Sequence, residues 1–150
     1  MSPPNDTDRL DADQARLLRD QYARIAGDPA GFAAGFYARL FSLAPLTRAL
    51  FRQHMDAQGD RFMHKLGELI DQAGRPAEMA ATIDRLATLH LAHGLVREDS
   101  APVLRALLDE LQSRLGDDFD AHARAAWTAL YTLTVAPMFA APADDGLPAG

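Results

Sequence analysis

The sequence predicts an all-α protein with six substantial helices and a short helix after the second. Apolar residues recur three and four positions apart through most of the 150 residues, which is the period of a helix face. The candidate helices are bounded by N-cap residues, by prolines at first helical positions and by closing glycines. We find no convincing strand pattern and no internal repeat, so helices must form the core.

Length and composition fit one globular domain whose core can enclose a cofactor. A chain of this length buries about two thirds of the surface that its unfolded form exposes. The formal net charge of −6 disfavours nucleic acid and anionic membranes as partners, so we expect a small molecule or another protein. The absence of cysteine excludes disulfides, thiolate metal sites and Fe–S clusters. Iron or zinc would depend on histidine or carboxylate ligands.

No segment has the pattern of a targeting or membrane-spanning sequence. The first nine residues lack the basic start and apolar run of a signal peptide, and the apolar segment 129–141 is too short to span a bilayer. We therefore expect a cytoplasmic monomer or homodimer that does not bind a membrane. The expected organisation is a flexible leader over 1–10, a folded domain over 11–141 and a disordered tail over 142–150.

Boundary signals define the helices in order. Asp11 and Gln14 have the spacing of a capping box, which predicts a first helix to about residue 26. Asp28 and Pro29 begin the second helix, and Pro45 begins a short one that ends near residue 51. The remaining helices are expected from about residue 58 to the break at 74–76, and over 78–92, 101–115 and 119–141.

His90 is a candidate functional residue because it lies on an apolar helix face. Ile83, Leu86 and Ala87 precede it by seven, four and three positions and share that face. A buried imidazole needs a hydrogen bond, a charge or a metal. His90 is thus either a core histidine bonded to a backbone carbonyl or a ligand of a metal or haem.

Two other polar side chains fall on apolar faces. The second helix has a broad aromatic face, formed by Phe32, Phe36, Tyr37, Leu40 and Phe41. The Tyr37 hydroxyl either bonds the backbone or donates into a cavity. Gln58 lies at the start of the apolar stripe of the next long helix. It is either a polar group at the end of the helix or a contact to a ligand. The five histidines form no HExxH or other clear multi-histidine metal motif.

Five short motifs follow one another along the chain. They are Phe36-Tyr37-x-x-Leu40-Phe41, Pro45 with Phe51, Gln58-x-x-Arg61-Phe62, Leu89-His90 with Gly94, and Ala126-Trp127-x-x-x-Tyr131. Each is weak alone, but in this order and spacing they resemble the globins. The resemblance is greatest to bacterial single-domain haemoglobins, which are similar to the haem domain of flavohaemoglobins. It covers nearly the whole domain and implies a globin fold.

The resemblance implies a site for haem b, iron protoporphyrin IX. His90 would be the metal ligand, and Phe51 would pack against the porphyrin. Tyr37 and Gln58 would form the distal polar pair and act as the catalytic residues, with the tyrosine donating to bound O2 and the glutamine supporting it.

The same resemblance implies roles at the edge of the site. Phe62 would cap the distal pocket, Arg61 would be a partner for a haem propionate, and His93 would be a rim or propionate-side group. Ser100 and Pro142 stand where flavohaemoglobins carry a tyrosine and a glutamate. We therefore expect the proximal hydrogen bonding that favours O–O cleavage to be absent.

The function implied is binding of O2, and of NO or CO, with nitric oxide dioxygenation as the reaction. We expect turnover to require a separate reductase, because these residues include no flavin or nicotinamide domain. One alternative is a gas sensor or interaction module of globin shape. The other is a bis-histidyl electron-transfer haem protein, with His54 as the sixth ligand.

Overall fold

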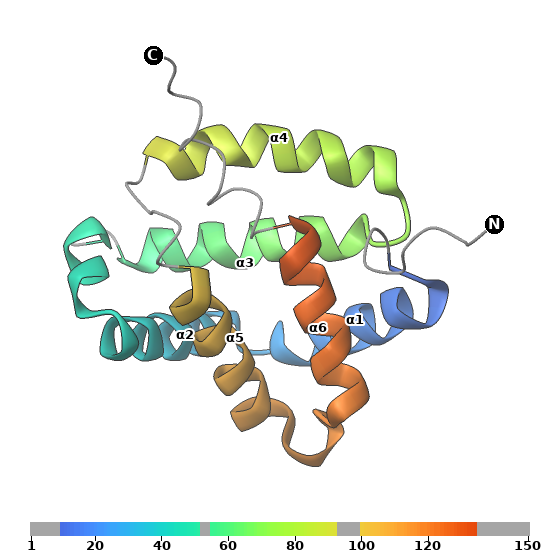
Figure 1. Cartoon of the computed structure of the whole chain (residues 1–150). Coiled ribbons are helices and arrows are strands. Elements are labelled where there is room, and N and C mark those ends of the chain that lie inside the picture. Colours follow the sequence, from blue (N-terminus) through green and yellow to red (C-terminus); the bar gives the residue numbers. More distant parts are fainter. Residues whose placement is uncertain (1–9, 52–54, 93–99, 135–150) are drawn as a thin grey trace.

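Helices make up all the regular structure in the residues that the computed structural model describes, which are 10–51, 55–92 and 100–134 (Figure 1). Of residues 50–51, 55–56 and 86–92 only the backbone is described. The α-helices are α1 (Ala12–Ile25), α2 (Pro29–Leu43), α3 (Met55–Asp71), α4 (Pro76–Ala92), α5 (Ser100–Leu115) and α6 (Ala121–Thr134). Two 3-10 helices, η2 (Pro45–Phe51) and η4 (Gly116–Asp118), follow α2 and α5. The all-α prediction is confirmed.

Most of the predicted leader and all of the predicted tail lie outside the described residues, although Leu10 is buried in the core at 5% exposure. No helix in the described part of the chain is both long and apolar enough to cross a membrane.

Helix capping follows the local sequence. Asp11 Oδ1 accepts from the Gln14 amide at 2.7 Å, and Gln14 Oε1 accepts from the Asp11 amide at 3.0 Å, which confirms the predicted capping box. Asp28 caps α2, with Pro29 at its first position. The last helix begins two residues later than predicted, because Asp120 Oδ1 caps it by accepting from the Ala123 amide at 2.9 Å.

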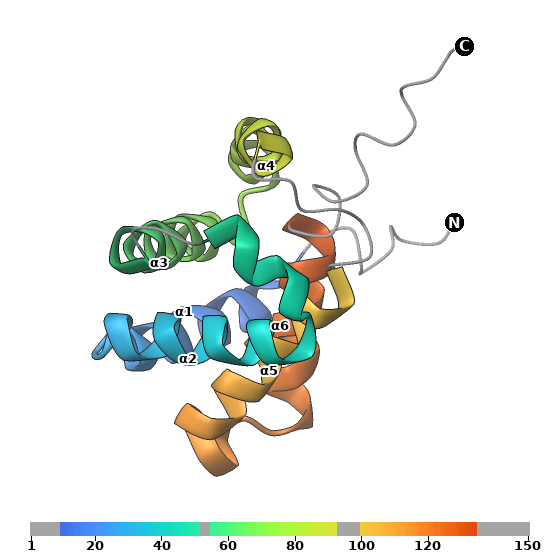
Figure 2. The same ribbon diagram turned by 90° about the vertical axis from the view of Figure 1, so that its left-hand side faces the viewer.

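The helices form layers around α3. In Figures 1 and 2, α4 is outermost, α3 lies beneath it, and α1 and α2 lie on the other side of α3. Close helix packing joins α2 to both α5 and α3, and α1 to α6. Within the part of the chain that the structure describes, α4 approaches the α6 backbone at few positions and the α3 backbone at fewer. This arrangement leaves α4 as the helix least tied to its neighbours.

A buried amide connects α1 to the end of the chain. The Trp127 indole N–H donates to Gln21 Oε1 at 2.8 Å, and Gln21 Nε2 donates to the Asp118 carbonyl at 2.9 Å. Trp127 is fully buried and Gln21 is 4% exposed. One side chain thereby satisfies two polar groups that would otherwise be costly to bury.

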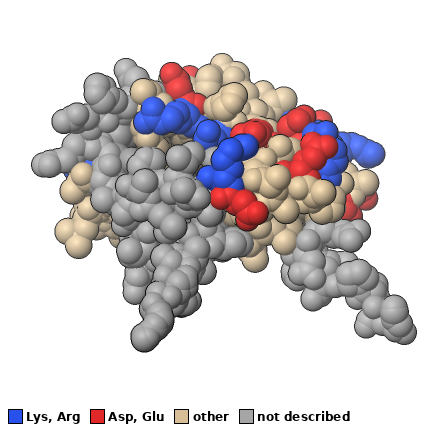
Figure 3. Space-filling view, turned by 90° about the horizontal axis from the view of Figure 1, so that it is seen from above, with Lys and Arg blue, Asp and Glu red and all other residues tan. Residues whose placement is uncertain are grey.

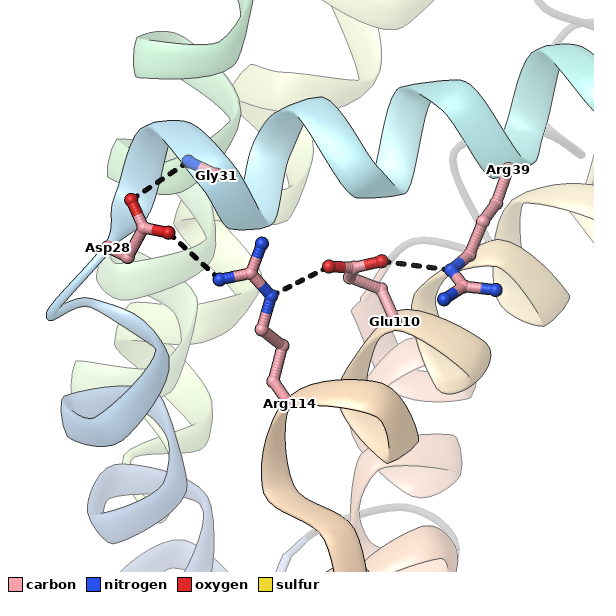
Figure 4. A network of polar contacts seen from close by, with 5 residues as sticks. All are labelled: Asp28, Gly31, Arg39, Glu110 and Arg114. Carbon is pink, nitrogen blue, oxygen red and sulfur yellow. Dashed lines mark hydrogen bonds and ion pairs between the residues drawn. The ribbon is translucent and has the colours of Figure 1, made fainter.

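A charged network crosses the contact between α2 and α5 (Figure 4). The buried Glu110 carboxylate accepts from Arg39 Nε at 2.9 Å and from Arg114 Nε at 2.8 Å. Arg114 also donates to Asp28, the N-cap of α2, at 3.0 Å. The hydrogen bond from Arg114, with one from the Gly31 amide, lowers the pKa of Asp28 below its ordinary value. The positive charges of Arg39 and Arg114 thus compensate the buried negative charge of Glu110 where α2 packs on α5.

Candidate functional site

Tyr37 and Gln58 meet where α2 crosses α3. The crossing is close, since a Cβ added at Gly59 would lie only 3.1 Å from the Ala33 Cβ. Gln58 Nε2 donates to the Tyr37 hydroxyl oxygen at 3.0 Å. Tyr37 is 5% exposed and Gln58 is half-buried. The fold therefore brings together the two polar side chains that the sequence analysis singled out on separate helices.

Arg61 extends this pair toward the surface. Its Nη2 donates to Gln58 Oε1 at 2.9 Å, one turn further along α3. The resemblance implied a haem propionate as the partner of Arg61, and the contact with Gln58 was not predicted. The three-residue spacing on one helix is the signal from which the contact could have been predicted.

An aromatic cluster surrounds the Tyr37 ring. Phe62 stacks on Phe36, with ring centroids 4.5 Å apart and an interplanar angle of 8°, and it meets Tyr37 edge-on at 5.8 Å and 68°. Phe36 also meets Tyr37 edge-on at 4.9 Å, and Phe32 stacks on Phe62 at 6.5 Å. Phe62 is half-buried, and its ring packs against the aromatic side chains of α2. Its role as the cap of a distal pocket stays a prediction.

The environment keeps Tyr37 in its neutral form. Burial raises the pKa of the phenol above its ordinary value, and the hydrogen bond from Gln58 and the positive charge of Arg61 offset part of this rise. At neutral pH the hydroxyl therefore retains its proton. A neutral phenol can donate a hydrogen bond within an apolar site.

Helix α4 carries His90 in its last turn. Met79 and Thr82 of this helix are buried, and the half-buried Ile83 packs against the core. The His90 side chain and that of Phe51 are outside what the structure describes, and His93 and His54 lie outside the described residues altogether. The metal-ligand role of His90 stays a prediction.

A mostly apolar cavity of about 300 Å³ opens beside α4. It lies between the turn after α3, the first half of α4, and α6. Its lining residues are Leu10, Gly74, Pro76, Met79, Ala80, Ile83 and Leu133. Gly74 has a φ of +92°, a left-handed conformation that glycine adopts without strain and that allows the chain to turn into α4.

Charges alternate on the outer face. Seen from above, basic and acidic side chains are interspersed over the part of this face that the structure describes (Figure 3). Arg85 of α4 pairs with Glu68 of α3 at 3.0 Å, and Arg75 pairs with Asp71 at 3.0 Å and with Glu78 at 3.2 Å. These exposed pairs contribute little to stability individually.

The structure is an all-α fold in which a polar pair joins two crossing helices, and helical proteins of this class can build a cofactor site in their core. The family model described as Globin matches residues 34–138, which is most of the chain. The chain belongs to the globin family, as the motifs predicted.

Three curated relatives are similar over almost the full length. The Globin-2 B chain of Anadara inaequivalvis is 21% identical over 138 residues, which cover 85% of this chain and 91% of that protein. The minor globin of Anadara trapezia is 23% identical, covering 81% and 88%. Neuroglobin-1 of Oncorhynchus mykiss is 26% identical, covering 93% and 96%. Globins bind haem and, through it, gaseous ligands. The likeness to bacterial haemoglobins stays a prediction.

Proposed function

We propose that this globin binds dioxygen, and also NO or CO, with Tyr37 and Gln58 as the polar pair that meets the ligand and His90 as the iron ligand. The observation that carries the proposal is the 3.0 Å hydrogen bond from Gln58 Nε2 to the Tyr37 hydroxyl, at the edge of an aromatic cluster. A polar pair in this position is useful when a polar ligand binds beside it, because the phenol can donate a hydrogen bond to that ligand. When bound, haem b supplies an iron atom with an open position for a diatomic gas.

The residues of the chain fit such a group in two ways. First, the described part of α4 does not pack closely along α3, and a mostly apolar cavity of about 300 Å³ opens beside α4. Second, His90 follows Ile83 by two helical turns, and Ile83 packs against the core. By helical periodicity we expect His90 on the same face as Ile83, which is where the proposal requires an imidazole.

The Tyr37 hydroxyl would donate a hydrogen bond to bound dioxygen. Because the phenol is buried and neutral, this bond forms in a medium of low dielectric constant, where it is stronger than in water. The stacked rings of Phe36 and Phe62 pack beside the phenol and would limit the access of water to it. Gln58 holds the phenol in place. This arrangement favours slow release of dioxygen.

The test is the rate of dioxygen release from the haem-loaded Tyr37→Phe variant, measured by stopped-flow spectroscopy. A buried hydrogen bond is worth about 1 to 3 kcal/mol, so release should accelerate by roughly 5- to 150-fold. Tyr22→Phe is the matched control, because the Tyr22 hydroxyl donates instead to the Met63 carbonyl at 2.8 Å. Equal release rates in Tyr37→Phe and the wild type would sink the proposal.

The proposed role of His90 has its own spectroscopic test. The wild type should bind one haem and show a Soret band that shifts on reduction and on addition of CO. In His90→Ala the band should be lost or displaced. A wild type that binds no stoichiometric haem would contradict the proposal and favour an interaction module of globin shape. A low-spin ferrous spectrum without added ligand would instead identify a bis-histidyl protein.

We further infer that nitric oxide dioxygenation is the reaction this site can support. Haem iron would supply the one electron needed to combine dioxygen and NO into nitrate, and a separate reductase would return that electron. Sustained consumption of NO in the presence of a reductase and its reductant is the expected result. Consumption that stops after one equivalent would identify a carrier or scavenger.

A further inference from the structure

We propose that Arg61 is a positioning residue that sets the direction of the hydrogen bond between Gln58 and Tyr37. The proposal rests on the proposed function, because the direction of this bond matters most when Tyr37 faces a ligand. It assigns Arg61 a role different from contact with a haem propionate.

The donor chemistry of arginine fixes the orientation of the amide. A guanidinium carries N–H donors and no acceptor. The Gln58 atom that lies 2.9 Å from Arg61 Nη2 must therefore be the carbonyl oxygen. The amide nitrogen then faces Tyr37 at 3.0 Å, and the phenol oxygen accepts from it. In this orientation the Tyr37 hydroxyl accepts a hydrogen bond from Gln58 and does not donate its own proton to it.

Rotation of the amide by half a turn would reverse this polarity. The two ends of a primary amide are similar in size, so both orientations fit the same space. In the rotated form the carbonyl oxygen of Gln58 faces Tyr37 and accepts the phenol proton. The hydroxyl would then donate to Gln58 in competition with a ligand. Only the orientation that Arg61 stabilises directs the proton away from the amide.

Burial and charge are arranged to support this role. Arg61 is exposed, Gln58 is half-buried and Tyr37 is buried, so the three residues lead from solvent to the phenol. A charged donor strengthens the bond to the Gln58 carbonyl and polarises the amide, which in turn strengthens the bond to Tyr37. Because the arginine remains hydrated, its charge carries no large desolvation cost.

The first test is dioxygen release from the haem-loaded Arg61→Met variant, which keeps a long apolar stem and lacks donors. Release should accelerate by about 2- to 12-fold, as for the loss of one ordinary hydrogen bond. In a Gln58→Leu background the same substitution should have no further effect. Arg105→Met is the control, because Arg105 pairs with Asp109 on α5 at 3.0 Å. An undiminished effect of Arg61→Met in the Gln58→Leu background would overturn the inference and favour a propionate contact.

The second test reads the amide directly, by nuclear magnetic resonance of the full-length protein without dioxygen. The Gln58 side-chain NH2 protons should be dispersed and slow to exchange in the wild type, and should move toward solvent-like values in Arg61→Met. Arg61→Lys, which retains a charged donor, should restore part of the wild-type signal. Unchanged Gln58 signals in Arg61→Met would overturn the inference, while a large effect of Tyr37→Phe on release would still support the proposed function.

Discussion

Substitution of Gly35 by alanine tests the charged network between α2 and α5. Gly35 lies on α2 directly over Glu110, and an added Cβ would come closer to the carboxylate than any real contact permits. A flexible side chain would usually move aside. Here Arg39 and Arg114 hold both carboxylate oxygens, so the carboxylate can move only by weakening two ion pairs (Figure 4).

The size of the effect follows from three quantities. Disruption of a fully buried ion pair costs about 3 to 5 kcal/mol. The two arginine side chains are 39% and 31% exposed, so solvent screens part of this, and we expect a cost of about 2 to 4 kcal/mol. Alanine favours the helix over glycine by about 1 kcal/mol. The free energy of unfolding should therefore fall by about 1 to 3 kcal/mol.

The assay is urea unfolding followed by far-ultraviolet circular dichroism, in the wild type, Gly35→Ala, Glu110→Ala and the double variant. With the carboxylate removed, the new methyl group has room, and only the helix preference remains. Gly35→Ala should then stabilise the Glu110→Ala protein by about 0.5 to 1 kcal/mol. A substitution that is neutral in the wild type, or equally costly in both backgrounds, would refute the reasoning.

Two further predictions concern buried polar groups. Burial raises the pKa of Tyr131 to about 12 from its ordinary value of 10.0, with a smaller opposing effect of Ser100, so the folded state favours the protonated phenol. The free energy of unfolding should therefore fall by about 2 to 3 kcal/mol between about pH 10 and pH 12. Chemical unfolding should show this loss in the wild type and a smaller one in Tyr131→Phe; equal slopes would contradict it. Gln21→Met leaves the Trp127 N–H and the Asp118 carbonyl without their partner and should cost about 2 to 4 kcal/mol in urea unfolding. A cost below about 1 kcal/mol would mean that other groups or water replace the amide.

Local sequence was sufficient to predict most of the helices. The capping box of Asp11 and Gln14, and the N-cap Asp28 before Pro29, act within three residues, so their effect is readable from neighbours in the chain. The end of the α5 region was less predictable. Residues 116–118, which lie between the helices expected over 101–115 and 119–141, form a 3-10 turn with Gly116 at a φ of +58°.

The candidate site was predictable in part. Helical periodicity identified Tyr37 and Gln58 as polar residues on apolar faces, and the order of the motifs identified the family. Neither periodicity nor the order of the motifs specifies how two helices lie relative to each other in space. The 3.0 Å contact between these residues, and the turn of Arg61 toward Gln58, depend on how closely α2 and α3 approach at Ala33 and Gly59.

The sequence by itself determined most of the helix boundaries to within a few residues, the apolar faces and the family of this protein, because these depend on interactions within a few turns of chain or on the order of short motifs. Only the tertiary structure decided which polar groups satisfy one another. Gln21 bonds Trp127, 106 positions away, and Glu110 bonds Arg39, 71 positions away. Such partners are set by the crossing of packed helices, since a buried polar group must bond whatever the crossing brings within about 3 Å.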